Sequence, residues 1–470
     1  MGKGFMLLTT GVTAIGGFLF GYDVGVIGGC ITMTQFLNVF PAIAEDEVLK
    51  GFVVASLTIG CLIGALATSY FADRFGRKLS CMGGAAIFTV GALLQTIASS
   101  LAVLILGRFI AGLAVGMLSA IVPLYLSEIA PKEKRGALVS AQQLTITIGI
   151  VISFFTNFGS DQLEGDLAFR LPFGIQMVFS TFMIIGMVFL PRSPRWLVAQ
   201  GRVKEAMEVL VRVRDSVSDA QQELDEIQDS IRLEREIGNG SWRELKDNGM
   251  WRRVLIGIGL QMFQQLTGIN VVMYYSNDVL KSAGFTGRQL TLLSTAVTGI
   301  VNVVATLPGM YLIDRAGRRV LLLTGDLVMA ASFAVLAALI GVYQPEFSVK
   351  AVPWVCLIMM CIFTAGFAYS WGPICWVYPS EIFPLRIRAK AVSLATASNW
   401  LFNALIGLLA PLLMKLLGWG FYLVLVGFLA IMGTWVFFKV PETKGKSLED
   451  MDAIFGDKPP ASKTVETKDI

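Results

Sequence analysis

Residues 16–29 read GGFLFGYDVGVIGG, an apolar stretch that is rich in glycine and carries a single acid, Asp23. With flanking residues from about Leu7, the stretch is long enough to cross a bilayer, so Asp23 is expected inside the hydrocarbon layer. An ionisable group is costly there and normally has a partner or a function, and glycines let neighbouring helices approach closely. The simpler alternative is that Asp23 faces a water-filled vestibule and has no role.

The composition is that of a polytopic helical membrane protein. Of 470 residues, 55% are hydrophobic and 15% are charged, whereas a soluble protein carries about 25% charge. We predict twelve spans, with boundaries good to a few residues. They are 7–29, 48–72, 79–98, 101–126, 137–158, 171–190, 251–279, 289–313, 320–342, 351–378, 388–415 and 419–438.

The charges exclude several classes of function. The net charge is only +4 and there is no basic stripe, so nucleic acid is not an expected partner. The chain has no histidine, and its six cysteines lack metal-like spacing. We therefore expect no metal site, no cofactor and no enzymatic activity.

A long polar segment divides the predicted spans into two sets of six. This gives four regions: bundle 1–190, linker 191–250, bundle 251–440 and tail 441–470. The linker shows helical periodicity, so we expect amphipathic helices that either latch the halves together or form a solvated connection. Lys and Arg gather in the loops on the linker's side of the bilayer, which places both termini in the cytoplasm.

The two halves repeat each other. DRFGRK at 73–78 matches DRAGRR at 314–319, and SEIAPKEKRGALVS at 127–140 matches SEIFPLRIRAKAVS at 380–393. Likewise PRSP from Pro191 closes the first half as PET from Pro441 closes the second. Two similar halves in parallel orientation are what a rocking transporter requires.

The repeated charges lie at the cytoplasmic ends of helices, where acids and bases of neighbouring helices can pair. We interpret them as an inner gate that holds the halves together when the cavity opens outward. The alternative is that they only anchor helix ends at the interface. The gate residues are Asp73, Arg74, Arg77, Glu128, Arg135, Asp314, Arg315, Arg318, Glu381 and Arg388.

Together with PRSPRWL at 191–197, QQLTGIN at 264–270 and PETKG at 441–445, these motifs resemble the sugar porter family of the major facilitator superfamily. The resemblance covers nearly the whole chain and is strongest to fungal and microbial hexose or pentose transporters. It implies an all-α membrane fold of twelve helices in two six-helix bundles, with a helical cytoplasmic linker.

Arg108, in the fourth predicted span, is the expected partner of Asp23. Both residues lie about 10 Å below the outer surface at 1.5 Å per residue, so contact is permitted. Protonation of Asp23 would free Arg108, which is a proton switch. Proton-coupled sugar porters resemble this arrangement, whereas facilitative relatives often have a neutral residue at the acid's position.

Polar residues near the middle of the second-half spans suit a neutral polyol, which needs amides and an aromatic face in a mostly apolar cleft. The resemblance places these residues at sugar-contacting positions: Phe20, Gln143, Gln264, Gln265, Asn270, Asn302, Gly372, Trp376 and Asn399. It places Tyr274 and Tyr275 at the outer gate. Gly268 and the pair Gly372-Pro373 are expected to break their helices, and Asp326 is expected to contact the inner gate.

We therefore predict a proton-coupled monosaccharide symporter of the glucose or xylose type, working by alternating access. Its expected partners are the monosaccharide, protons and the lipid bilayer, and it is expected to act as a monomer in the plasma membrane. Three alternatives stay open: a facilitative uniporter, a polyol or inositol symporter, and a nutrient sensor.

Overall fold

A computed structural model describes residues 2–130, 135–214, 216–237, 244–245, 250–344, 347, 349–383, 385–444 and 455. Within these residues the secondary structure is helical, without strands. The chain forms 12 segments that are long and apolar enough to cross a membrane, which confirms the predicted fold class. The side chains of Arg135, Asp314 and Arg388 lie outside the described part.

Each span of the first half is a single helix. The spans are α1 (Gly2–Cys30), α4 (Glu47–Phe75), α5 (Arg77–Ile97), α6 (Leu101–Ile129), α7 (Arg135–Ser160) and α8 (Leu167–Phe189). Helix α4 begins where Asp46 accepts hydrogen bonds from the backbone N–H groups of Val48 (2.8 Å) and Leu49 (3.1 Å). This cap satisfies orphan donors of the first turn.

The second half has six spans, two of which are broken. They are α12 with α13 (Met250–Leu266, Ile269–Ser282), α14 (Arg288–Ala316), α15 (Arg318–Tyr343), α16 with α17 (Val352–Tyr369, Trp371–Ile382), α18 (Leu385–Leu417) and α19 (Gly420–Lys439).

The breaks in the second half differ in how well the sequence predicts them. Gly268 has a φ of +89°, a left-handed conformation that suits glycine, and it separates α12 from α13 as expected. The other break falls at Ser370 (φ −123°, ψ −91°) and not at Gly372-Pro373. Pro373 is tolerated because it is the third residue of α17, where its missing N–H is not needed.

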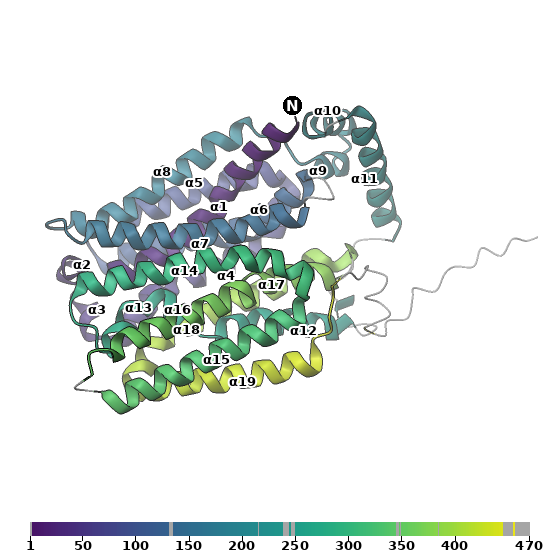
Figure 1. The fold of residues 1–470 in the computed structure, drawn as a ribbon. Coiled ribbons are helices and arrows are strands. Elements are labelled where there is room, and N and C mark those ends of the chain that lie inside the picture. Colours follow the sequence, from purple (N-terminus) through teal and green to yellow (C-terminus); the bar gives the residue numbers. More distant parts are fainter. Residues whose placement is uncertain are drawn as a thin grey trace, which may run out of the picture.

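Helix packing repeats between the halves. In the first half α1 packs on α7, α4 on α6, and α5 on α6 and α8. The counterparts in the second half are α12 on α18, α14 on α16, and α15 on α16 and α19. The halves meet where α4 packs on α18 and α7 on α14, and Figure 1 shows them as two layers of nearly parallel helices.

Two sets of short helices mark opposite ends of the bundle (Figure 1). Helices α2 (Thr34–Val39) and α3 (Ala42–Glu45) lie at one end, and α9 (Pro194–Ala199), α10 (Val203–Val213) and α11 (Val217–Ile237) lie at the other. We call these the α2–α3 end and the α9–α11 end. The α9–α11 unit is attached to the first half, because Arg214 donates to the carbonyl of Ile129 in α6 (2.9 Å) and Trp196 to that of Asp73 (3.0 Å).

Glycines bring α4 and α6 into backbone contact. Gly60 of α4 faces Gly112 of α6, while Gly64 packs on the backbone of Leu113 and Gly116 on that of Cys61; each glycine pair has the spacing of the small-residue motif of membrane helices. A Cβ atom at Gly112 would lie 2.0 Å from the carbonyl oxygen of Leu57, so a larger residue requires the helices to separate.

We predict that Gly112→Val lowers the free energy of unfolding by about 1–3 kcal/mol, because the added atoms overpack this crossing. The measurement is the thermal unfolding midpoint in detergent. Gly427→Val is the matched control, since a Cβ atom there has open space within 4 Å. Equal midpoints for the two variants would contradict the prediction.

Candidate functional site

Asp23 of α1 and Arg108 of α6 lie close together inside the first half. Arg108 Nη1 is 4.0 Å from Asp23 Oδ1, and both side chains are 0% exposed. The guanidinium donates instead to the carbonyl of Val53 in α4 (2.8 Å) and to Gln95 Oε1 in α5 (3.5 Å). Among the described residues, neither carboxyl oxygen of Asp23 has a hydrogen-bond partner. Arg108 is therefore hydrogen-bonded to Val53 and Gln95, and Asp23 lies beside it without a hydrogen bond to it.

The glycines around Asp23 have a packing role on two sides of α1. A Cβ atom at Gly21 would lie 1.9 Å from the carbonyl oxygen of Ile146 in α7, within the same half. At Gly28 it would lie 2.9 Å from the carbonyl oxygens of Met273 and Tyr274 in α13, across the junction between halves. The close approach expected from the sequence thus brings α1 against α7 of its own half and against α13 of the second half.

In the second half, buried amides form a hydrogen-bonded chain. Asn399 Nδ2 of α18 donates to Gln261 Oε1 (2.6 Å) and Gln264 Oε1 (2.7 Å) of α12. Gln265 Nε2 donates to Gln264 Oε1 (3.2 Å), and Asn270 donates to Gln265. All of these side chains are buried, so four of the predicted sugar-site residues are brought together.

This amide chain is anchored on α17, just after the break at Ser370. Gln264 Nε2 donates to the carbonyls of Trp371 (3.0 Å) and Gly372 (3.1 Å). From the first half, Gln143 approaches the same place, since its Nε2 would lie 3.6 Å from a Cβ atom at Gly372. The amides therefore meet α17 at the junction between halves.

An aromatic pair also crosses the junction. The rings of Phe20 in α1 and Trp400 in α18 have centroids 5.1 Å apart, and Trp400 follows directly on Asn399. Trp376 is half-buried on α17, one turn beyond Gly372. Asn302 is buried on α14, where its carbonyl accepts from Thr306 (2.8 Å), and no described hydrogen bond joins it to the amide chain.

The predicted outer-gate tyrosines are buried on α13. Tyr274 donates to Asn403 Oδ1 (3.0 Å) and Tyr275 to the carbonyl of Gly407 (2.5 Å), both on α18. Helix α13 departs from helical geometry at Tyr275 (φ −120°, ψ 22°). The hydroxyl groups thus hold a kinked helix against its neighbour in the same half.

The repeated charged motifs meet at the α9–α11 end, one set in each half. Arg77 lies 3.0 Å from Glu128, which also accepts from Ser193. In the second half, Arg318 lies 2.7 Å from Glu381, which accepts from Thr443 (2.6 Å). The repeats of DRxGR, SEI and the closing motif thus build the same three-part contact twice.

These contacts differ from the expectation that acid–base pairs hold the halves together. Arg77–Glu128 joins α5 to α6, and Arg318–Glu381 joins α15 to α17, so each pair lies within one half. Asp73 pairs with Arg77 in the same motif (3.4 Å), while Arg74 is exposed and Arg315 stacks on Tyr311 (4.3 Å). In this conformation the motifs brace helix ends inside a half.

Asp326 does not contact the inner charges. It is buried on α15 and faces α19, where a Cβ atom at Gly433 would lie 2.4 Å from its Oδ2. Its Oδ1 has no hydrogen-bond partner among the described residues. The expected inner-gate contact is therefore wrong: Gly433 provides the space that this carboxyl group occupies within the second half.

Comparison with known proteins agrees with this architecture. Residues 9–455 match the family model described as "Sugar (and other) transporter". The chain belongs to this family of sugar transporters. It is 35% identical to the MFS glucose transporter mfs1 of Aspergillus flavus, over 97% of this chain and 91% of the relative. It is 36% identical to the low-affinity glucose transporter HXT3 of Saccharomyces cerevisiae, over 95% and 81%.

The sugar transporter also matches a solved structure of the same superfamily. The proton:xylose symporter XylE of E. coli, bound to 6-bromo-6-deoxy-D-glucose, superposes with a TM-score of 0.82 at 30% identity. The match covers 97% of this chain and 100% of that chain. The protein is thus a multi-pass membrane transporter of the major facilitator superfamily, and not an enzyme.

Three further residues make contacts at these sites of the transporter, and the sequence alone did not single them out. Gln261 accepts from Asn399 and donates to the carbonyl of Cys375 (2.8 Å), Gln95 accepts from Arg108, and Trp400 packs against Phe20 at a tilted angle. Gln261 lies three residues before Gln264, on the same helix face. That spacing was the signal available for it.

We predict that Arg77→Ala lowers the free energy of unfolding by about 2 kcal/mol. The reason is that Glu128, only 6% exposed, would lose its cation. The measurement is thermal unfolding of the purified transporter. Arg74→Ala, in the same motif but exposed, is the control and should change stability by less than about 0.5 kcal/mol. An equal loss in both variants would argue against the pairing.

Proposed function

We propose that this transporter is a proton-coupled monosaccharide importer of the glucose or xylose type that works by alternating access. The observation that carries the proposal is the Asp23–Arg108 contact at 4.0 Å, with the carboxyl group buried and without a hydrogen-bond partner in the described part of the chain. The printed names of the relatives agree with it, since mfs1 and HXT3 are glucose transporters and XylE is a proton:xylose symporter.

The surroundings of Asp23 favour its protonated form. An ionised carboxylate that is fully buried and lacks donors carries a large desolvation cost, which Arg108 at 4.0 Å offsets only in part. This packing therefore suits the protonated acid. When Asp23 loses its proton, attraction between opposite charges would draw Arg108 away from Val53 and toward α1.

Rearrangement of Arg108 is linked to the junction between halves through α1. Helix α1 carries Asp23, packs Phe20 against Trp400 and packs Gly28 on α13. A change in the Asp23–Arg108 distance therefore acts on a helix that contacts the second half at two places. In this way, a change in the protonation of Asp23 would be coupled mechanically to the sugar site.

The amide chain is the proposed sugar site. Gln264, Gln265, Asn270 and Asn399 supply donors and acceptors for hydroxyl groups, and Phe20, Trp376 and Trp400 supply aromatic faces. These amides bond one another here, so a sugar would replace amide–amide bonds with bonds of its own. Gln143 and Asn302 would complete the site from α7 and α14.

The distribution of basic residues gives the orientation. Arg77, Lys78, Arg318 and Arg319 all lie at the helix ends that face α9–α11, so the positive-inside rule assigns this end to the cytoplasm. We place both termini there and the protein in the plasma membrane as a functional monomer. The braced motifs of the two halves would then form the inner gate, pairing across the junction when the cavity opens outward.

We predict that Asp23→Asn keeps sugar exchange but loses accumulation driven by a pH gradient, because the amide cannot release a proton. The measurement is radiolabelled glucose and xylose uptake into proteoliposomes, with and without the gradient. Asp326→Asn is the matched control, since this second buried acid faces α19, and it should keep accumulation. Full accumulation by Asp23→Asn would favour a uniporter.

We also predict that Gln264→Ala raises the sugar concentration for half-maximal exchange about tenfold, the value of one or two lost hydrogen bonds. Competition by a panel of hexoses, pentoses and inositols in the same assay separates a monosaccharide carrier from a polyol carrier. Gln176→Ala, a buried amide on α8 in the first half, serves as the control and should leave this concentration unchanged. Equal shifts in the two variants would argue against the proposed sugar site.

A further inference from the structure

An ion pair joins the two halves at the α2–α3 end. Lys50 Nζ in the first turn of α4 lies 2.6 Å from Asp278 Oδ2 on α13, and their side chains are 14% and 25% exposed. The pair belongs to neither the proton contact nor the amide chain. Unlike Arg77–Glu128 and Arg318–Glu381, it links the first half to the second.

The pair acts on the segment of α13 that holds the tyrosines. Lys50 Nζ also lies 5.8 Å from the centre of the Tyr275 ring, within the range of a cation–π contact. Beside Asp278, Asn277 donates across the junction to the carbonyl of Gly28 (3.0 Å) and to Thr32 (3.1 Å). Lys50 and Asn277 thus fasten the kinked helix to α4 and to α1.

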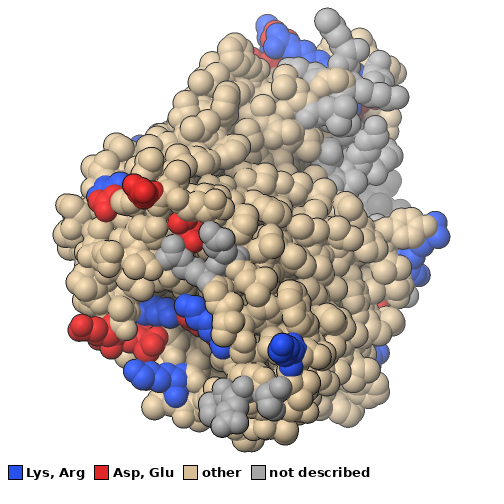
Figure 2. Space-filling view, turned by 60° about the vertical axis from the view of Figure 1, so that its left-hand side comes forward, with Lys and Arg blue, Asp and Glu red and all other residues tan. Residues whose placement is uncertain are grey.

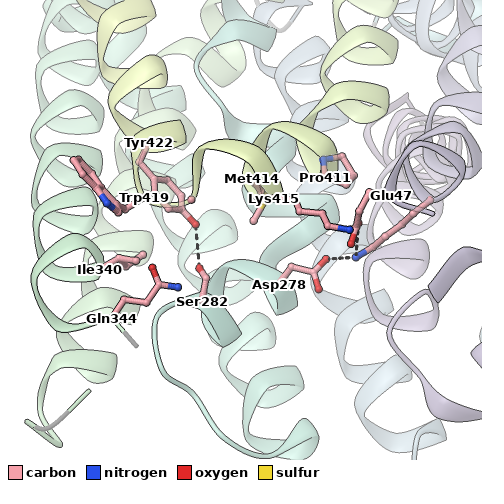
Figure 3. A pocket seen from close by; sticks show the side chains of 12 residues that line it. Glu47, Asp278, Ser282, Ile340, Gln344, Pro411, Met414, Lys415, Trp419 and Tyr422 are labelled. Atoms are coloured by element: carbon pink, nitrogen blue, oxygen red, sulfur yellow. Dashed lines mark hydrogen bonds and ion pairs between the residues drawn. The ribbon is translucent and has the colours of Figure 1, made fainter. Parts of the chain in front are cut away.

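An open pocket borders this contact. The pocket, of about 230 Å³, is lined by Glu47, Lys50, Asp278 and Lys415, with Trp419 and Tyr422 on its far side. Figure 2 shows charged side chains on this otherwise mainly uncharged face, and Figure 3 shows Glu47, Asp278 and Lys415 bordering the pocket. Charges beside water cost less to separate than charges in the bilayer interior.

Lys50 also has a second acid nearby. Glu47 lies 3.9 Å from Lys50 on the same helix, whereas Asp278 lines the pocket together with Lys415. When α4 and α13 move apart, Lys50 therefore retains Glu47, and Asp278 remains at the pocket, where water can solvate its charge.

We propose that Lys50 and Asp278 form a latch that stabilises the conformation closed at the α2–α3 end, and that this latch must open for sugar to enter there. The proposal rests on alternating access as proposed above. It assigns Lys50 and Asp278 as positioning residues, which act on the gate helix α13 and not on the sugar.

The test measures opening directly, without sugar. Val54 is fully buried one turn after Lys50, and its Cγ1 would lie 3.5 Å from a Cβ atom at Gly407 of α18. A Val54→Cys variant therefore reports separation of α4 from α18. Its rate of labelling by a membrane-impermeant thiol reagent is measured in sealed proteoliposomes by mass spectrometry. Native Cys30, which bonds Asn157 within the first half, is the internal reference.

We predict that Lys50→Met and Asp278→Asn each raise the labelling rate of the cysteine at position 54 about threefold, as expected for loss of a partly exposed ion pair. The charge-exchanged double variant Lys50→Asp with Asp278→Lys should return the rate toward that of the unaltered latch. Labelling of Cys30 should not change in any variant. A double variant that folds but labels as fast as the single variants would overturn the proposal.

Ionic strength gives a second readout that does not depend on the double variant. Salt screens partly exposed charges. A higher ionic strength should therefore speed labelling of the cysteine at position 54 when the latch is present and have no effect on that rate in Lys50→Met. An equal salt response in both would overturn the proposal. Sugar exchange is recorded in parallel. If labelling changes as predicted but the protein exchanges no sugar, the result contradicts the proposed function and leaves the latch supported.

Discussion

A guanidinium group that is cut off from water sets the main constraint on the first half. Two of its nitrogens donate to protein groups, Nε to Val53 of α4 and Nη1 to Gln95 of α5, while Asp23 of α1 lies within 4.0 Å. Four helices therefore converge on one side chain. The glycines of α1, α4 and α6 allow that convergence, because larger residues would hold the backbones too far apart for these contacts.

The second half uses the same packing plan for a different purpose. Its helices pair in the order of the first half, and its charged motifs rebuild the contact of Arg77, Glu128 and Ser193 with Arg318, Glu381 and Thr443. Its centre, however, holds neutral amides and broken helices. The two halves therefore share a framework but differ at their centres, where one is built on charged groups and the other on hydrogen-bonding amides.

Much of this arrangement is readable from the sequence. Apolar runs of spanning length predicted the twelve membrane segments, and equal depth predicted that Asp23 and Arg108 can meet. The break at Ser370 was missed because proline is tolerated in the first turn of α17. Gln261 was missed although its spacing of three residues from Gln264 places both side chains on one face of α12. Lys50 was overlooked because it lies at the start of the predicted span 48–72, and the partners of the inner charges depend on conformation, which a single sequence does not specify.

The two broken spans have a consequence for how the carrier could diversify. The spans of the first half are each one continuous helix, whereas α12/α13 and α16/α17 are jointed beside the amide chain. Bending within helices can thus be confined to the second bundle, while the first bundle moves as a rigid body. Sequence changes that alter which pattern of hydroxyl groups is accepted would then accumulate around the joints, without disturbing the contact of Asp23 with Arg108 that we propose for proton coupling. Selectivity and energy coupling would be separable traits, free to evolve on different halves of the same chain.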